Sequence, residues 1–395
     1  MAAHGLRDRV AVVGMGCTPF RDHWQRSADD LLVEAVEECV ASCPGLELGE
    51  VDAYWVGTQG SGMSGMTLSK PLRLREKPVT RVENFCATGS ESFRNACFAV
   101  ASGAYDVVMA TGVEKLKDSP YSGLTATWPP SDGTDVEWTA PGAFSLLAPA
   151  YADRYGVDAD ALREALTHIA VKNHANGALN ERAQYRRPVA AEAVTSAPRI
   201  AGPLGVLDCS GVSDGAAAAL IVRAEDAARH TDRPVFLKGM SFVAGAGDGL
   251  AREGYDFTTF PEVVAAAKEA YAQAGVADPR AEIALAEVHD CFTPTELVLM
   301  EDLGFSARGQ AWRDVLDGVF DRDGSLPVNP DGGLKSFGHP VGATGLRMLF
   351  ECWQQLRGEA GERQVPDAKL ALTQNLGGQP GACVAFVAVV GQEEG

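Results

Sequence analysis

Two cysteine-containing segments carry the clearest chemical signal in the chain. The first is ENFCATGSES (83–92), in which Cys86 directly precedes a run whose apolar residues repeat at helical spacing. A cysteine on a tight turn that leads into a helix lies near free backbone N–H groups and the positive end of the helix dipole, which favours the thiolate. We therefore expect Cys86 to be a nucleophile. The alternative is a buried structural thiol, which is the expectation for Cys97 inside the helical stripe.

The second segment is HDCF, formed by His289, Asp290, Cys291 and Phe292 directly after the apolar run IALAEV. In α/β folds the ends of strands are where reactive side chains gather. The alternative is a turn with a capping aspartate and a hydrogen-bonded histidine. A second thiol in the same protein favours the functional interpretation.

Two glycine-rich segments complete the set. NPDGGLKSFGHPVGATG (329–345) places His339 just before a helical pattern, and its glycines let the backbone approach a ligand closely. Neither G-x-x-x-x-G-K-[ST] nor G-x-G-x-x-G opens that helix, so His339 is better interpreted as a base or hydrogen-bond donor than as part of a phosphate loop. QNLGGQPG (374–381) is predicted to form the turn of a C-terminal hairpin, where glycine N–H groups can point at an oxyanion. Glycine-rich hairpin turns are common, so this signal alone is weak.

The elements around these motifs predict an α/β fold. Apolar runs indicate strands and 3.6-residue periodicity indicates helices. The chain opens with a strand and a helix, and a similar order recurs after residue 216, which favours an internal duplication. Residues 119–205 are predicted to be an insertion over the core that stays irregular until a helix at 158–176. The expected strands are 9–14, 51–57, 105–112, 216–222, 234–239, 282–288, 369–373 and 382–390, and the other expected helices are 27–42, 87–102 and 261–273.

Composition narrows the function classes. With 34 basic and 53 acidic residues among 395, the net charge of −19 repels phosphate backbones and argues against nucleic acid as a partner. Nine cysteines without C-x-x-C pairs indicate neither a disulfide scaffold nor a zinc site, and no metal is expected. No signal peptide or membrane span is recognisable, so we expect a cytoplasmic location.

Taken in this order, the four segments resemble the thiolase superfamily, and in detail its sterol-carrier-type and archaeal-type members. The resemblance runs from about residue 10 to residue 390. The segment DCSGVSDGAAAALIV (208–222) resembles the family's strand in which a serine, here Ser210, contacts the pantetheine arm of coenzyme A. One departure matters, because other thiolases carry a second catalytic cysteine in a C-x-G motif where this chain has Asn375-Leu376-Gly377. The family's known alternative is the cysteine of HDCF, so Cys291 takes that role, while Cys383 does not match it.

The resemblance implies a five-layered α-β-α-β-α fold of two similar halves, residues 1–222 and 223–395, with an inserted loop domain at about 119–205. It further implies a homodimer or tetramer that uses coenzyme A as a substrate and needs no cofactor. A small acyl-CoA-binding partner with an OB-fold and a zinc ribbon accompanies many archaeal-type members.

The implied reaction forms or cleaves a 3-ketoacyl-CoA by Claisen condensation or thiolysis through an acyl-cysteine intermediate. Thioester chemistry needs a soft nucleophile, a base and donors for an oxyanion. Cys86 would be the nucleophile, His339 its base, and the backbone N–H groups of Cys86 and Gly377 the oxyanion donors. Cys291 would move the α-proton. The remaining expected site residues are His289, which with His339 would hydrogen-bond the thioester oxygen, and Ser210 and Phe292, which would bind substrate.

Three other functions are compatible with the same fold: a CoA-thioester retro-aldolase, an acyltransferase with a non-CoA acceptor, and a non-catalytic acyl-CoA or lipid carrier. The retro-aldolases typically depart from the cysteine and histidine pattern, and we expect no carrier domain appended to the fold. For the phosphates of coenzyme A, Arg186, Arg187 and Lys335 are candidates, against the commoner alternative of solvated surface charge. His174 is expected to be structural.

Overall fold

The computed structural model describes residues 5–118, 139–251 and 255–392. Within them, the apolar runs form one mixed sheet of nine strands in the order β3-β2-β4-β7-β1-β8-β11-β10-β9. Most strands are buried along most of their length, as expected for a sheet covered on both faces. The strands are β1 (Val10–Cys17), β2 (Ala53–Gly57), β3 (Val79–Val82), β4 (Val107–Glu114), β7 (Gly215–Arg223), β8 (Val235–Ala244), β9 (Leu285–Glu287), β10 (Leu370–Gln379) and β11 (Ala382–Gly391).

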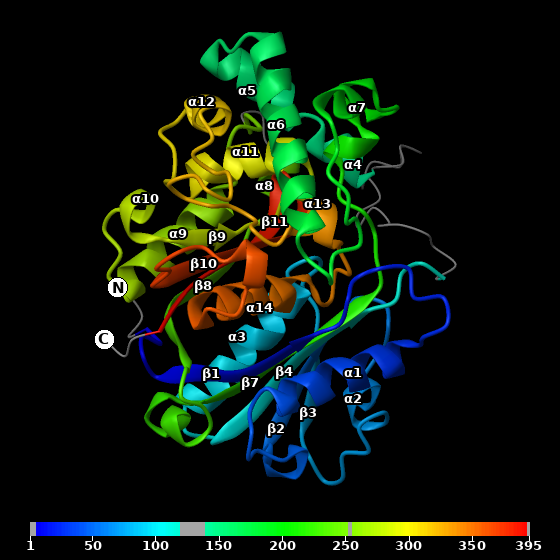
Figure 1. Cartoon of the computed structure of the whole chain (residues 1–395), viewed down its shortest axis with the longest axis vertical. Coiled ribbons are helices and arrows are strands. Elements are labelled where there is room, and N and C mark those ends of the chain that lie inside the picture. Colours follow the sequence, from blue (N-terminus) through cyan, green and yellow to red (C-terminus); the bar gives the residue numbers. More distant parts are fainter. Residues whose placement is uncertain (1–4, 119–138, 252–254, 393–395) are drawn as a thin grey trace.

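The sheet consists of two parts joined at one short seam. Strand β1 pairs with β8 only at Ala11↔Phe236 and Val12↔Val235. The strands of the first part lie on one side of helices α3 (Thr88–Ala101) and α14 (Thr344–Arg357), and those of the second part lie on the other side (Figure 1). These two helices therefore form a central layer, and every residue of α14 except Gln354 is buried.

Outer helices close both faces. Helix α1 (Ala28–Ala41) packs on the first part, and α9 (Pro261–Ala274) and α11 (Thr293–Asp302) pack on the second. Ser27 caps α1 in a reciprocal capping box with Asp30, which explains why the helix begins there. The arrangement confirms the predicted α/β, five-layered α-β-α-β-α fold.

The insertion packs on the second part of the molecule. Its longest helix, α6 (Ala159–Ala178), lies against α11, α12 (Ala311–Leu316) and α13 (Gly333–Phe337). The expectation of irregular chain up to residue 158 is wrong from residue 140 onward, because apolar side chains there form short helices that pack into the core. The first part of the predicted insertion, residues 119–138, lies outside the described residues. The other elements of the insertion are α4 (Ala140–Phe144), α5 (Leu147–Tyr155), α7 (Ala191–Ser196), β5 (Arg199–Ala201) and β6 (Leu204–Gly205).

The C-terminal hairpin differs from its prediction in one respect that affects the site. Strand β10 continues to Gln379, so residues 374–378 lie inside the strand and pair with β11 instead of forming the turn. Gly378 pairs with Cys383 and has a φ of 96°, a conformation that glycine adopts without steric cost. Short helices complete the chain: α2 (Met66–Ser69), α8 (Asp248–Ala251) and α10 (Pro279–Glu282). Among the described residues, no helix has the length and apolar character needed to cross a membrane.

Candidate active site

A strained turn between β3 and α3 carries Cys86. Phe85 has a positive φ of 51°, which is rare for a bulky residue and places strain directly before the cysteine. The hydroxyl of Thr88 accepts a hydrogen bond from the N–H of Asn84 (2.8 Å) and donates to the carbonyl of Phe85 (2.5 Å). These bonds hold the turn at the entrance of α3, where the sequence placed it.

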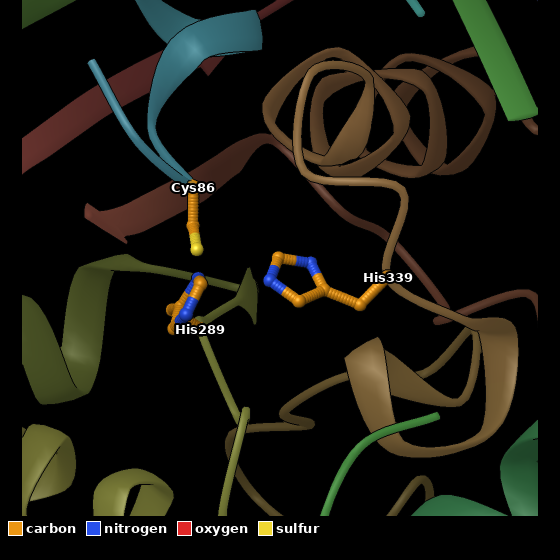
Figure 2. A group of neighbouring side chains, drawn as sticks. All are labelled: Cys86, His289 and His339. Carbon is orange, nitrogen blue, oxygen red and sulfur yellow. The ribbon is translucent and has the colours of Figure 1, made fainter. Parts of the chain in front are cut away.

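Three side chains from three separate segments meet at this turn. Cys86, His289 and His339 point toward one another in Figure 2, and one ligand atom from each lies within 4.8 Å of the others. His289 follows β9, and His339 belongs to the loop between α13 and α14. The structure therefore brings together the predicted nucleophile and both predicted histidines.

Asn375 sets the protonation pattern of His289. Its amide nitrogen donates to the carbonyl of Cys86 (3.0 Å) and to the hydroxyl of Ser90 (3.2 Å), so its oxygen faces Nδ1 of His289 at 2.8 Å. An amide oxygen only accepts hydrogen bonds, so Nδ1 of His289 carries the proton. In the neutral ring, Nε2 then presents a lone pair.

Thr344 does the same for His339. Its hydroxyl donates to the carbonyl of Pro340 (3.1 Å) and lies 2.8 Å from Nδ1 of His339. Because the single hydroxyl hydrogen is used on Pro340, the imidazole Nδ1 is the donor in the second bond. Nε2 of His339 is buried without a hydrogen-bond partner, so it too presents a lone pair.

Burial keeps all three groups uncharged at rest. It lowers the pKa of His289 to about 4 and the pKa of His339 well below its ordinary value. It also raises the pKa of Cys86 to about 12. This desolvation opposes the effect that we expect from the helix dipole on the Cys86 thiolate, and the helix itself begins only at Thr88. Removing the proton of Cys86 requires an adjacent base.

Cys291 is buried close by. Its Sγ lies 3.6 Å from Oγ1 of Thr295, and burial raises the pKa of Cys291 well above its ordinary range, with a further upward effect from charge on Cys86. The backbone carbonyl of Cys291 accepts a hydrogen bond from the N–H of Ser210 at 2.8 Å. Phe292 packs against Phe144, with ring centroids 4.9 Å apart. The segment of Ser210 is thus attached to the HDCF segment by its backbone.

Asp290 connects two of the motifs. Its carboxylate accepts hydrogen bonds from the N–H of Leu334 (2.6 Å) and from the amide of Asn173 (2.8 Å). It therefore caps α13, which leads into the loop of His339. Asp290 thus caps a distant helix and not its own turn, and this contact holds the HDCF segment against the histidine loop.

Gly377 lies in β10 against the nucleophile turn. A Cβ at this position would stand 2.5 Å from the carbonyl oxygen of Asn84 and 3.1 Å from the backbone nitrogen of Ala87. Only glycine lets the strand approach the Cys86 turn this closely. The backbone of Gly377 is thus beside the turn, although in a strand and not in a hairpin loop.

The phosphate candidates divide into two groups. Arg186 and Arg187 are exposed. Lys335 is 1% exposed and donates to the carbonyls of Leu207 and Cys209, so its candidacy for the phosphates is wrong: the ammonium is used to hold the chain before Ser210.

His174 and Cys383 are both buried among other side chains of the protein. His174 is buried, with a pKa lowered to about 4 by burial first and by the charge of Lys335 second. Cys383 is buried and lies 3.2 Å from a carboxylate oxygen of Glu262.

Sequence reasoning missed the two residues that fix the histidine tautomers. Asn375 was noted only as the residue that replaces a cysteine, and Thr344 was not singled out. Thr344 follows His339 by five residues at the start of a helix, a spacing that could have suggested the contact. The bonds of Asn375 join positions 86 and 289 across almost the whole chain, so no local pattern could reveal them.

Family comparisons agree with this geometry. A family model described as "Thiolase, N-terminal domain" matches residues 10–225, and one described as "Thiolase C-terminal domain-like" matches residues 250–390. An "Acetyl-CoA acetyltransferase" of Methanothermobacter thermautotrophicus is 37% identical, covering 97% of this chain and 99% of the relative. "Sterol carrier protein 2" of Bos taurus is 32% identical, covering 94% of this chain and 70% of the relative. The chain belongs to the thiolase family, and it is a thiolase-type acyltransferase.

Solved structures show the same architecture. The structure titled "Ltp2-ChsH2(DUF35) aldolase" has a TM-score of 0.85 and 27% identity, covering 99% of both chains. Human mitochondrial 3-ketoacyl-CoA thiolase has a TM-score of 0.72 and 19% identity, covering 98% of this chain and 99% of that one, and it supports the fold alone.

Proposed function

We propose that this enzyme transfers an acyl group between coenzyme A thioesters, forming or cleaving a 3-ketoacyl-CoA through an acyl group on Cys86. The observation that carries the proposal is the convergence of the Cys86 thiol with two imidazoles, one ligand atom from each within 4.8 Å of the others. Because Nδ1 of His339 is a donor to Thr344, its bare Nε2 is free to take the thiol proton. The names of the acetyltransferase relatives favour acetyl-CoA as one substrate.

In the cleavage direction, Cys86 gives its proton to His339 and its sulfur bonds to the 3-keto carbon. The bond between C2 and C3 breaks, and the acetyl-CoA carbanion takes a proton from Cys291. The buried thiol of Cys291 suits this step, since its raised pKa keeps it protonated at rest. The incoming coenzyme A thiol then returns a proton to Cys291 and attacks the acyl group, and Cys86 leaves with the proton held by His339.

Charge on the carbonyl oxygens needs donors. We assign the backbone N–H groups of Cys86 and Gly377 to the tetrahedral oxyanion, which is supported by the contact between β10 and the Cys86 turn. His339 becomes a donor at Nε2 only after it has received a proton, so its help to the thioester oxygen follows proton transfer. Neutral His289 with its proton on Nδ1 offers only an acceptor at Nε2, so the predicted hydrogen bond from His289 to the thioester oxygen is wrong for this tautomer. We keep Ser210 and Phe292 as proposed substrate-binding residues.

Purified protein incubated with acetoacetyl-CoA and coenzyme A tests these roles. Thiolysis should be lost in Cys86→Ala, and an acyl adduct should accumulate on Cys86 in Cys291→Ala when it is given acetyl-CoA, as seen by mass spectrometry of the peptide. Cys97→Ala, which removes a thiol from the core of α3, is the matched control and should keep activity. Thiolysis that persists in Cys86→Ala would refute the proposal.

A retro-aldolase acting on a CoA thioester is the second candidate. It is favoured by the likeness to the Ltp2-ChsH2(DUF35) aldolase at a TM-score of 0.85. A retro-aldol cleavage releases an aldehyde or ketone and needs no acyl-enzyme, so trapping of acyl-Cys86 separates the two reactions. An acyltransferase with a non-CoA acceptor would form the adduct but fail to release it to coenzyme A, and a carrier would form none.

We further propose a homodimer or tetramer in the cytoplasm, and a small OB-fold and zinc-ribbon protein as partner. The two-protein title of the aldolase structure supports the partner. Co-purification after joint expression with a DUF35-type protein, together with light scattering of the chain alone, tests both assembly statements.

A further inference from the structure

The resting site is made entirely of electron-pair donors. Nε2 of His289 and Nε2 of His339 have lone pairs because their Nδ1 protons are held by Asn375 and Thr344. The third group is the sulfur of Cys86, and one ligand atom from each residue lies within 4.8 Å of the others. None of these three side chains carries a positive charge in the resting site.

We propose that Cys86, His289 and His339 bind one soft divalent cation, such as Zn²⁺, and that the bound cation blocks the nucleophile. One thiolate and two neutral imidazoles are ligands that Zn²⁺ prefers, and three protein ligands leave a fourth position for water or an incoming thiol. C-x-x-C spacing cannot reveal such a site, since its ligands come from three distant segments.

The distances allow closure. With bonds of about 2.3 Å to sulfur and 2.0–2.1 Å to nitrogen, tetrahedral zinc holds one sulfur and two nitrogens roughly 3.3–3.6 Å apart. The present limit of 4.8 Å is larger by about an ångström. Rotation of the half-buried Cys86 side chain on its turn can shorten its distances to both rings, which are already neighbours with centroids 5.3 Å apart.

The surroundings have the form of a metal site. Histidines that bind a metal through one ring nitrogen usually donate the other N–H to a protein acceptor, which fixes the ring and its tautomer. Both rings here do so, to an amide oxygen at 2.8 Å and to a hydroxyl at 2.8 Å. Nε2 of His339, buried without a hydrogen-bond partner, gives an independent indication that the site awaits a ligand or a proton.

Cation binding exchanges one proton for one ion. Cys86 releases its proton to solvent as sulfur bonds to the metal, and no other covalent bond changes. The cation then occupies the lone pair of His339 that the mechanism needs and the sulfur that attacks the thioester. Binding stands on the geometry alone, whereas inhibition of acyl transfer rests on the proposed function.

Cobalt(II) is the probe, because it replaces zinc and gives a thiolate-to-metal charge-transfer absorption. Titration of the metal-free protein should show one Co²⁺ per chain with that band, and Zn²⁺ should abolish the band by displacement. Cys86→Ser, which keeps the size of the side chain, should lose the band, and His339→Asn should weaken binding at least tenfold. Cys97→Ala, the matched control, should bind as wild type does.

Two outcomes would overturn the site: no band at micromolar Co²⁺ in wild type, or a band that survives Cys86→Ser and disappears in Cys291→Ala. Acylation of Cys86 by acetyl-CoA, measured separately by mass spectrometry, identifies which statement fails. A cobalt band without acylation leaves the site and removes the proposed function, whereas acylation without a band removes only the metal site.

Discussion

At the scale of single residues, the site depends on the hydrogen bonds behind its reactive atoms. Cys86 is a poor nucleophile until a base acts on it, since burial raises its pKa to about 12. The base in turn has a bare Nε2 only because Thr344 holds the opposite nitrogen. In the same way, the side-chain oxygen of Asn375 accepts a hydrogen bond from Nδ1 of His289. The amide nitrogen of Asn375 also donates to the carbonyl of Cys86. The chemistry available to each histidine therefore depends on the residue that binds its Nδ1.

Asn375→Ala should lower kcat for thiolysis by about 10- to 100-fold, the range found when a group that orients a reactive histidine is removed. It should also reduce the free energy of unfolding by about 1–3 kcal/mol, because His289 and the Cys86 carbonyl lose a buried partner. Asn180→Ala is the control, since Asn180 donates to the carbonyl of Asp331 in a similarly buried place. Equal loss of kcat in both variants would contradict a specific role for Asn375.

His174 gives a prediction about acid stability. Its folded pKa of about 4 lies below an ordinary value near 6.5, so the unfolded chain binds the proton more readily. The stability gained from keeping the ring neutral is complete above about pH 6.5 and is lost as the pH falls toward 4, by about 3 kcal/mol. Urea denaturation of wild type and His174→Gln at several pH values should show this difference in slope. Parallel curves would exclude the titration of His174.

At the scale of elements, most strands and helices were predictable and their contacts were not. Ser27 and Pro261 mark helix starts by their own chemistry, so α1 and α9 begin as the sequence indicates. The short, half-exposed β3 carries too little apolar pattern to be recognised, and β10 extends beyond its apolar run because pairing with β11 continues through Gly377. Both cysteines and both histidines were found from strand ends and turns.

The close approach of β4 to the loop before α14 can be tested by replacing a glycine of β4 with alanine. A Cβ on Gly112 would stand 2.2 Å from the carbonyl oxygen of Gly342, in the loop that contains His339. Gly112→Ala should therefore lower the free energy of unfolding by about 1–3 kcal/mol and reduce thiolysis. Gly49→Ala is the control, because nothing lies within 4 Å of a Cβ there. Thermal melting of both variants gives the comparison, and an unchanged melting temperature for Gly112→Ala would contradict the contact.

At the scale of the whole molecule, a buried ionic cluster lies at the centre. Arg347 of α14 is fully buried and bonds the carboxylates of Glu287 (2.6 Å) and Asp331 (2.5 Å). The three groups join the central helix layer to β9 and to the segment before α13. Its position next to the two histidines helps keep them neutral, since the charge of Arg347 lowers the pKa of both after burial has done so.

Arg347→Met should lower the free energy of unfolding by about 3–5 kcal/mol, because two carboxylates are left buried without their cation. Lys70→Met, which removes an exposed cation paired with Asp29, should change it by less than about 1 kcal/mol. Guanidinium unfolding followed by fluorescence checks both values. A small effect at Arg347 would show that water or protonation relieves the carboxylates.

The narrow seam between β1 and β8 has a consequence for when the site is assembled during folding. The attacking sulfur is built into the amino-terminal portion, whereas its imidazole partners come from the carboxy-terminal portion. A chain in which only the earlier portion has folded lacks both imidazoles that lie beside Cys86. The complete set of one thiol and two imidazoles therefore exists only in molecules in which both portions have folded.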